Sequence, residues 1–167
     1  MAILKKIVHY LSYICYFLII LYVAVCIPNI FGYKPLVVLT GSMEPSFKPG
    51  SVIFYEKVEE KDIKEGDIIT FKIDNDTLVS HRVNKITEDG LYETKGDCNN
   101  APDSKLISYS NVVGKNTKVS IPYIGYYIRF VNDNLYLVMI VILILVSEFL
   151  LSNFGTFDID KNKEKEK

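Results

Sequence analysis

A serine in a short turn and a histidine farther along the chain are the residues of this sequence best suited to chemistry. Ser42 lies in the turn Thr40–Pro45, which follows a long apolar segment, and His81 comes 39 residues later as the only histidine outside the N-terminal segment. A serine hydroxyl is a poor nucleophile until a base takes its proton, and an imidazole can be that base near neutral pH. The pair therefore indicates a serine hydrolase, although the chain has 11 serines and such a pair also arises by chance.

Two aspartates could orient such a histidine. Asp97 and Asp103 lie in one loop, and antiparallel pairing of the strand before that loop could return it to the strand that contains His81. Both aspartates could instead form only the side-chain turns that are common in loops rich in glycine, asparagine and proline. By spacing alone, either carboxylate could hold the imidazole.

Short β-strands are the elements that must position these residues. Runs of β-branched and aromatic residues alternate with turn signals such as Pro49-Gly50 and Glu65-Gly66. We predict strands over Leu36–Leu39, Val52–Tyr55, Asp67–Ile73, Thr77–Val83, Leu91–Lys95 and Asn111–Ser120. In such a strand His81 points to one face and its two neighbours to the other. The pattern indicates a mainly β fold, a small antiparallel sandwich or barrel.

Two apolar segments flank this β-domain. Ile7–Ile27 contains no charged residue, and its 21 residues at about 1.5 Å each span roughly 31 Å, enough to cross a bilayer core. Lys5 and Lys6 resemble the start of a signal peptide, but the apolar run is long and ends without small residues for cleavage, so we interpret it as an uncleaved anchor. Leu135–Leu151, at the short end of the spanning range, is the second predicted transmembrane helix and carries Glu148.

The two segments divide the chain into an N-terminus 1–6, a first span 7–27, a β-domain 28–134, a second span 135–151 and a tail 152–167. Both ends carry lysines, so the positive-inside rule places both in the cytoplasm and the β-domain outside it. We therefore expect a multi-pass protein of the cell membrane, or of the endoplasmic reticulum membrane if the chain is eukaryotic. In that lumen Asn75–Thr77 would be a glycosylation sequon.

Composition argues against several other classes of protein. The net charge is −1 and no basic cluster is present, so we expect no nucleic-acid partner. Three cysteines do not make a disulfide framework, and Cys98 is interpreted as a loop residue rather than a catalytic thiol.

Tyr123, Tyr126 and Tyr127 precede the second span and predict an aromatic belt at the membrane surface, with a place in the β core as the alternative.

Three segments resemble the sequence boxes of type I signal peptidases. Thr40–Pro45 resembles the nucleophile box S-M-x-P, His81–Val83 the second box and Lys95–Asp103 the G-D-x-N loop, in the family's order. Because histidine stands where the common bacterial branch has lysine, the chain resembles the endoplasmic-reticulum-type branch, found also in archaea, in some Gram-positive bacteria and in the eukaryotic signal peptidase complex. Gly50-Ser51 departs from a Gly-Asp pair that the family often has, whereas Gly66-Asp67 keeps one.

The resemblance implies a signal-peptidase β-fold and a serine endopeptidase that removes N-terminal signal peptides from exported preproteins by cutting after small residues. Ser42 would be the nucleophile, His81 the general base and Asp103 the orienting acid. Asp97 would be a second required acid with a more structural role. The Ser42 backbone N–H, with the Thr40 hydroxyl, would hold the oxyanion.

The resemblance also implies how the substrate binds and which partners the chain has. An extended signal peptide would add a strand to the domain, and shallow apolar pockets for its small side chains would be lined by Val38, Met43, Phe47 and Val79. The lipid bilayer is the second expected partner, and further membrane subunits could accompany the chain. We expect no metal and no cofactor.

Two other interpretations were weighed against this one. A self-cleaving regulatory protease of the related repressor-cleaving fold would use a lysine base and would lack membrane anchors, so His81 and the two apolar segments argue against it. An inactive membrane-anchored β-module, such as an accessory subunit, would have no reason to combine Ser42, His81 and Asp103.

Overall fold

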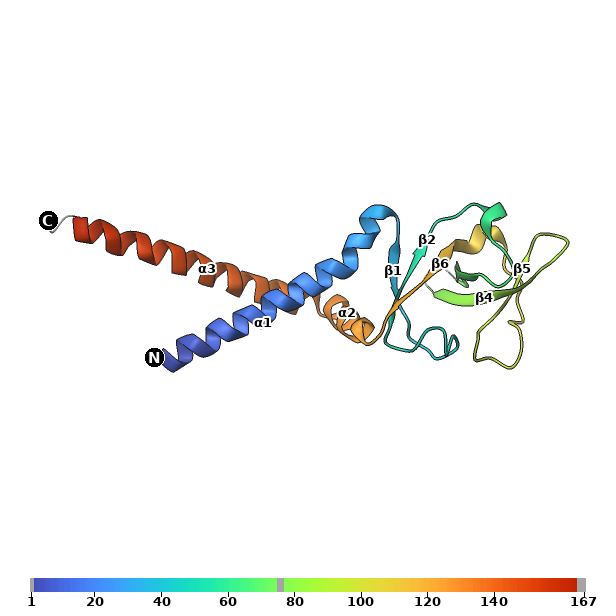
Figure 1. The fold of residues 1–167 in the computed structure, drawn as a ribbon, viewed down its shortest axis with the longest axis horizontal. Helices are drawn as coiled ribbons and strands as arrows, with labels where there is room; N and C mark the ends of the chain where they lie inside the picture. Colours follow the sequence, from blue (N-terminus) through green and yellow to red (C-terminus); the bar gives the residue numbers. More distant parts are fainter. Residues whose placement is uncertain (1, 75–76, 165–167) are drawn as a thin grey trace. The chain divides into compact units, whose positions relative to one another are not determined.

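One antiparallel β-sheet contains all six strands of the described residues (Figure 1). The computed structural model describes residues 2–74 and 77–164. Asn75 and Asp76 of the predicted sequon, with residue 1 and residues 165–167 of the predicted tails, lie outside these ranges. The chain divides into two compact units, of which Tyr22–Arg129 is one and the segments Met1–Leu21 and Phe130–Lys167 together are the other.

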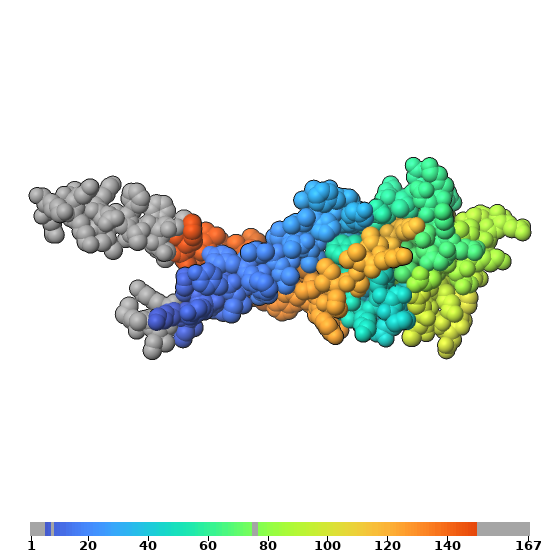
Figure 2. Space-filling model, in the orientation of Figure 1, coloured from blue at the N-terminus to red at the C-terminus, as the bar shows by residue number. Residues whose placement is uncertain are grey.

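The sheet has six strands, which agree closely with the predicted ones. They are β1 (Lys34–Val37), β2 (Val52–Glu56), β3 (Ile68–Lys72), β4 (Leu78–Ile86), β5 (Tyr92–Lys95) and β6 (Val112–Ile121). Their order is β1-β2-β6-β3-β4-β5, and every neighbouring pair is antiparallel. Figure 2 shows part of the surface of this unit, where the yellow-orange β6 region lies between the cyan and green segments of the chain. The prediction of a mainly β, antiparallel domain is confirmed, as one sheet rather than a two-sheet sandwich.

Both faces of the sheet carry apolar clusters. Loops and short helices, rather than a second sheet, cover these clusters. Ile69 on β3 packs in a cluster whose buried members are Ile63, Ile69, Phe71, Val83, Tyr92 and Ile107. Its neighbour Ile68 points to the other face and packs against Met43, Phe47 and Ile53. Met43, Phe47, Ile63 and Ile107 lie between strands, so connecting segments cover the sheet.

The tyrosines after β6 divide between surface and core. Tyr126 and Tyr127 lie in the first turn of α2 (Ile124–Asp133), and Tyr123 directly precedes it. Tyr123 is 76% exposed and Tyr126 61% exposed, whereas Tyr127 packs against a cluster that contains Val52. Tyr126 also explains Gly50, where φ is +78° and an added Cβ would lie 2.1 Å from the tyrosine ring. Tyr127 is therefore part of the core, which was the alternative weighed for this segment, whereas an aromatic belt at the membrane surface stays a prediction.

Two long helices, α1 (Ala2–Cys26) and α3 (Leu135–Glu164), lie mainly in the other unit. Among the described residues, one helical segment, His9–Phe31, is long and apolar enough to cross a membrane, and it overlaps the predicted first span. Ile124–Asp133 and Leu135–Phe149 meet that criterion only when taken together, across a break. The second span, 135–151, therefore stays a prediction.

Candidate active site

Ser42, His81 and Asp103 form a continuous row of hydrogen-bonded side chains. His81 Nε2 lies 3.2 Å from Ser42 Oγ, and His81 Nδ1 lies 2.6 Å from Asp103 Oδ2. The His81 side chain is 11% exposed and meets the Phe71 ring edge-on, with 6.4 Å between the ring centroids. The structure thus joins a hydroxyl, an imidazole and a carboxylate in the order that serine hydrolases use, and the carboxylate at the imidazole is Asp103 rather than Asp97.

Backbone contacts hold the turn that carries Ser42. The Glu44 N–H donates to the Gly41 carbonyl at 3.0 Å, and the Cys98 N–H donates to the Ser42 carbonyl at 2.9 Å. Gly96 lies close against the same carbonyl, since an added Cβ would be 2.6 Å from the Ser42 oxygen. The turn that contains Ser42 and the acidic loop therefore meet backbone to backbone, and this close contact requires glycine at position 96.

Thr94 on β5 fixes the position of Asp103. Its hydroxyl donates to Asp103 Oδ2 at 2.7 Å, the oxygen that also contacts His81, and its carbonyl accepts from the Asp103 N–H at 2.8 Å. Thr94 is fully buried. The sequence analysis missed this residue, and its inward position on an alternating strand directly before the acidic loop was the available signal.

Asp97 binds Arg82 instead of the imidazole. Arg82 Nε donates to Asp97 Oδ1 at 2.8 Å and Nη2 donates to Oδ2 at 2.7 Å, a two-pronged ion pair. Ser46 donates to the same carboxylate, and Arg82 Nη1 donates to the Gly66 carbonyl at 2.7 Å. Asp97 therefore ties the acidic loop to β4 and to the segment after Ser42. The sequence did not indicate a role for Arg82, which lies beside His81 on the opposite face of the strand.

The charge of Arg82 shapes the electrostatics of this pair. Its hydrogen bonds hold the pKa of Asp97 below the usual range for a carboxyl, against the opposing effect of burial, and the Ser46 hydroxyl adds to the lowering. The hydrogen bond with Asp97 in turn raises the pKa of the Arg82 guanidinium. Both groups are therefore charged at neutral pH.

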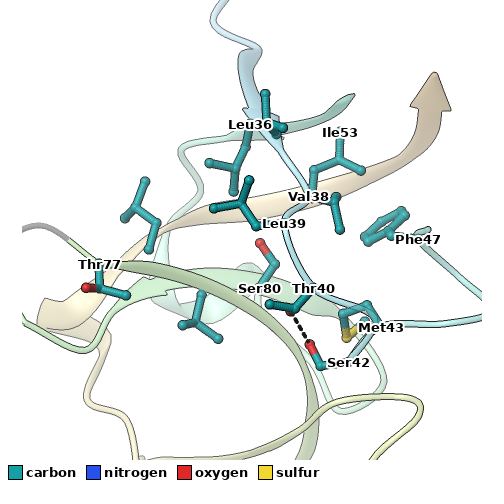
Figure 3. Close-up of a pocket in the computed structure, with 13 residues that line it drawn as sticks. Leu36, Val38, Leu39, Thr40, Ser42, Met43, Phe47, Ile53, Thr77 and Ser80 are labelled. Atoms are coloured by element: carbon teal, nitrogen blue, oxygen red, sulfur yellow. Dashed lines mark hydrogen bonds between the residues drawn. The ribbon is translucent and has the colours of Figure 1, made fainter. Parts of the chain in front are cut away.

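An apolar cavity of about 530 Å³ opens beside Ser42 (Figure 3). All four residues predicted to line substrate pockets, Val38, Met43, Phe47 and Val79, belong to its lining. The other lining residues come from the same segments: Leu36, Val37, Leu39, Thr40, Ser42, Ile53, Thr77, Leu78 and Ser80. At the edge of the cavity Thr40 Oγ1 lies 3.4 Å from Ser42 Oγ, the contact drawn dashed in Figure 3.

The strand beside this cavity has one free edge. β1 pairs with β2 alone in the described sheet. The N–H of Val38 donates to Ser51 at 2.9 Å and its carbonyl accepts from Gly50 at 2.8 Å, so both groups point toward the β2 side. In an antiparallel strand the next residue points its groups the other way, so the N–H and carbonyl of Val37 face the open edge. An extended peptide can pair there.

Comparison with known proteins finds similar sequences around Ser42 and His81. The family described as signal peptidase, peptidase S26, matches residues 10–87, a range that contains Ser42 and His81 but neither aspartate. Signal peptidase I W of Bacillus subtilis (strain 168) is 43% identical over 99 residues, which are 57% of this chain and 52% of that protein.

Eukaryotic proteins are similar over a comparable range. The signal peptidase complex catalytic subunit SEC11C of Homo sapiens is 36% identical over 110 residues, 59% of this chain and 57% of that protein. The corresponding subunit SEC11 of Candida tropicalis is 36% identical over 118 residues, 63% of this chain and 70% of that protein. The chain thus spans little more than half the length of the bacterial and human relatives.

The ion pair of Asp97 predicts a pH dependence of stability. A carboxyl whose pKa is lowered on folding stabilises the folded state fully above its unfolded pKa of ~3.9, and this stabilisation is lost as the pH falls through the folded value. We expect the melting temperature of the Asp97→Asn variant to lie several degrees below that of the unaltered chain at pH 7, with the difference shrinking below about pH 4.

Thermal unfolding of both proteins in detergent, measured between pH 7 and pH 3, checks this expectation. Asp89→Asn, which alters an exposed turn residue, is the matched control and should show little difference at any pH. A difference for Asp97→Asn that stays constant or grows on acidification would contradict the prediction.

Proposed function

Because the chain belongs to the signal peptidase family, peptidase S26, we propose that it is a serine endopeptidase that removes N-terminal signal peptides from exported preproteins. The observation that carries the proposal is the hydrogen-bonded row Ser42–His81–Asp103 at the edge of an apolar cavity. In this proposal the enzyme uses a histidine base, as in the endoplasmic-reticulum-type branch, and needs neither metal nor cofactor.

The row supports one assignment of protons. When His81 Nδ1–H donates to Asp103, the lone pair of Nε2 is directed at Ser42 Oγ and can accept its proton. Ser42 Oγ then attacks the carbonyl carbon of the scissile bond, and Asp103 stabilises the imidazolium that forms. His81 next gives the proton to the leaving amine, which departs and leaves an acyl ester on Ser42.

Water completes the cycle through the same groups. His81 takes a proton from the water that attacks the acyl ester, and it returns this proton to Ser42 Oγ as the ester bond breaks. The released signal peptide carries the new carboxyl group. Thr94 is a positioning residue in this scheme, because it acts on the imidazole through Asp103.

Backbone and side-chain donors near Ser42 support an oxyanion site. The Ser42 N–H donates to no backbone carbonyl within the described ranges, so it is free to bind the developing oxyanion. The Thr40 hydroxyl, near Ser42 Oγ, is the second proposed donor. Donors fixed in advance at such a position stabilise the charge of the transition state without reorganising.

The cavity and the free edge of β1 support a mode of substrate binding. We infer that the signal peptide lies extended beside β1, where main-chain hydrogen bonds supply affinity. Alternate side chains of an extended peptide point the same way, so small side chains before the cut would enter the cavity. Val38, Met43, Phe47 and Val79 would contact them.

The placement of the domains is part of the proposal. Residues 7–27 and 135–151 would cross the membrane, 1–6 and 152–167 would be cytoplasmic, and the β-domain of residues 28–134 would lie outside the cytoplasm. The apolar segment His9–Phe31 supports the first crossing. The enzyme would thus be a multi-pass protein of the cell membrane, or of the endoplasmic reticulum membrane in a eukaryote.

Partner proteins follow from the relatives. The human and Candida relatives are named as catalytic subunits of a signal peptidase complex. We therefore propose that membrane subunits can accompany this chain, beside its substrates and the lipid bilayer. The net charge of −1 supports the proposal that nucleic acid is not a partner.

Replacing the proposed nucleophile gives the most direct test. Ser42→Ala should lower cleavage of a preprotein in detergent micelles by a factor on the order of 10⁵–10⁶, because no other group can form the acyl ester. Gel analysis of the processed product, with thermal unfolding to show that the fold persists, measures the effect. Ser110→Ala, an exposed serine in the short helix Tyr109–Asn111, is the matched control, and undiminished processing by Ser42→Ala would refute the assignment.

Replacing Asp103 should mainly lower activity, whereas replacing Asp97 should mainly lower stability. Asp103→Asn is expected to lower kcat by roughly 10⁴-fold with a small change in melting temperature, because the amide no longer orients and charges the imidazole correctly. Asp97→Asn should instead lower the melting temperature and leave more of the activity, since its contacts are with Arg82 and Ser46. Steady-state kinetics and thermal unfolding of both variants measure these effects. A larger loss of kcat in Asp97→Asn than in Asp103→Asn would mean that the roles of the two aspartates are reversed.

The proposed topology can be tested with a native thiol. Cys98 is exposed on the β-domain, whereas Cys15 and Cys26 lie in α1. A maleimide that cannot cross membranes should label Cys98 in intact cells or spheroplasts, and Cys98→Ser should abolish most of the signal. Labelling that requires permeabilised membranes would contradict an extracytoplasmic β-domain.

A further inference from the structure

The cavity beside Ser42 contains a polar side chain that the proposed mechanism does not use. Ser80 on β4 lines this largely apolar cavity together with three other hydroxyl-bearing residues, Thr40, Ser42 and Thr77. Figure 3 shows Thr77 on the far side of the cavity from Ser42, while Thr40 lies beside the nucleophile. Ser80 adjoins His81 in sequence but points to the opposite face of the strand.

A buried hydrogen-bond network lies behind Ser80. Its Oγ lies 2.7 Å from Thr70 Oγ1 on the paired strand β3, and Thr70 Oγ1 donates to Asn116 Oδ1 on β6 at 2.8 Å. Thr70 is fully buried and Asn116 is 9% exposed. The network therefore runs from the cavity into the interior of the sheet across three strands.

With the Oδ1 atom of the Asn116 amide facing Thr70, the network sets which way the Ser80 proton points. A hydroxyl has one proton to donate, and Thr70 gives its proton to Asn116. Ser80 must then be the donor in its bond with Thr70. Its proton faces the sheet, and only oxygen lone pairs remain for the cavity.

The same arrangement leaves the Asn116 Nδ2 group buried without a hydrogen-bond partner in the described part of the chain. An unpaired buried donor destabilises a fold. The Ser80 hydroxyl is the end of this network that lines the cavity, so it is the group that a substrate side chain can reach.

We infer that Ser80 is a specificity-determining residue, whose oxygen accepts a hydrogen bond from a small hydroxyl-bearing side chain of the substrate, that of serine. The inference rests on the proposed function, because the occupant of the cavity is the peptide cut by Ser42. A few well-placed polar groups in an apolar pocket set its preference among ligands of similar size. Serine supplies the donor that Ser80 lacks, whereas alanine and 2-aminobutyrate do not.

The position in the substrate follows from the extended binding mode. If side chains alternate, the residue before the scissile bond and the third residue before it point into the cavity together. One of these two residues should therefore show the preference for serine, since Ser80 is a single acceptor. The second should be indifferent to a hydroxyl.

Peptide competition between matched substrates tests the inference. The full chain in detergent micelles would cleave peptides that carry serine, alanine or 2-aminobutyrate at each of the two positions. We expect kcat/KM for serine to exceed that for 2-aminobutyrate, which has the same shape without a donor, by about fivefold to tenfold at one position. In Ser80→Ala the ratio should fall to about one, and in Ser80→Thr, which keeps the hydroxyl, it should be largely retained.

The ratio within one protein cancels any loss of folded enzyme, so weakened folding of Ser80→Ala does not hide the result. Thr77→Val removes another hydroxyl from the same cavity and should keep the ratio of the unaltered chain. A ratio near one in the unaltered chain, or an unchanged ratio in Ser80→Ala, would overturn the inference while the proposed function stands. Failure of the unaltered chain to cleave any of the peptides would overturn both.

Discussion

Two neighbouring side chains on β4 each bind an aspartate of the same loop, and the rest of the site depends on this double attachment. His81 contacts Asp103 and Arg82 contacts Asp97. Because successive residues of a strand point to opposite faces, the loop must pass from one face of β4 to the other to reach both. β5, which pairs with β4 and leads into the loop, makes this passage short.

Ser42 reaches His81 from a distant part of the sheet. Ser42 follows β1, at one edge, while His81 lies on β4, with β2, β6 and β3 between them in the sheet order. The link from β1 to β2 covers one face of the sheet through Met43 and Phe47, which pack on Ile53. Burial of these apolar side chains therefore holds the link in a position that places the Ser42 hydroxyl next to the His81 imidazole. The cavity is the space between the link and β4.

The sequence predicted those parts of this arrangement that depend on local pattern. Alternation of polar and apolar residues located the strands, and the orientation of His81 followed from its strand. The choice between Asp97 and Asp103 depended on the path of the loop in space, which spacing does not reveal. Thr94 and Arg82 were missed because their contacts with Asp103 and Asp97 depend on how the loop folds back onto the sheet. A single sheet was mistaken for a sandwich or barrel because loops, rather than strands, cover its faces.

The backbone contact between the acidic loop and the turn that contains Ser42 has a consequence for how this site can evolve. The Ser42 carbonyl is held by the Cys98 N–H, a group that every residue except proline supplies, while the Cys98 side chain is exposed. Position 98 can therefore accept almost any residue without moving Ser42. Position 96 cannot, because any side chain there would collide with the Ser42 carbonyl. Within three residues of sequence, the loop combines a site of wide mutational tolerance with one of near-complete intolerance.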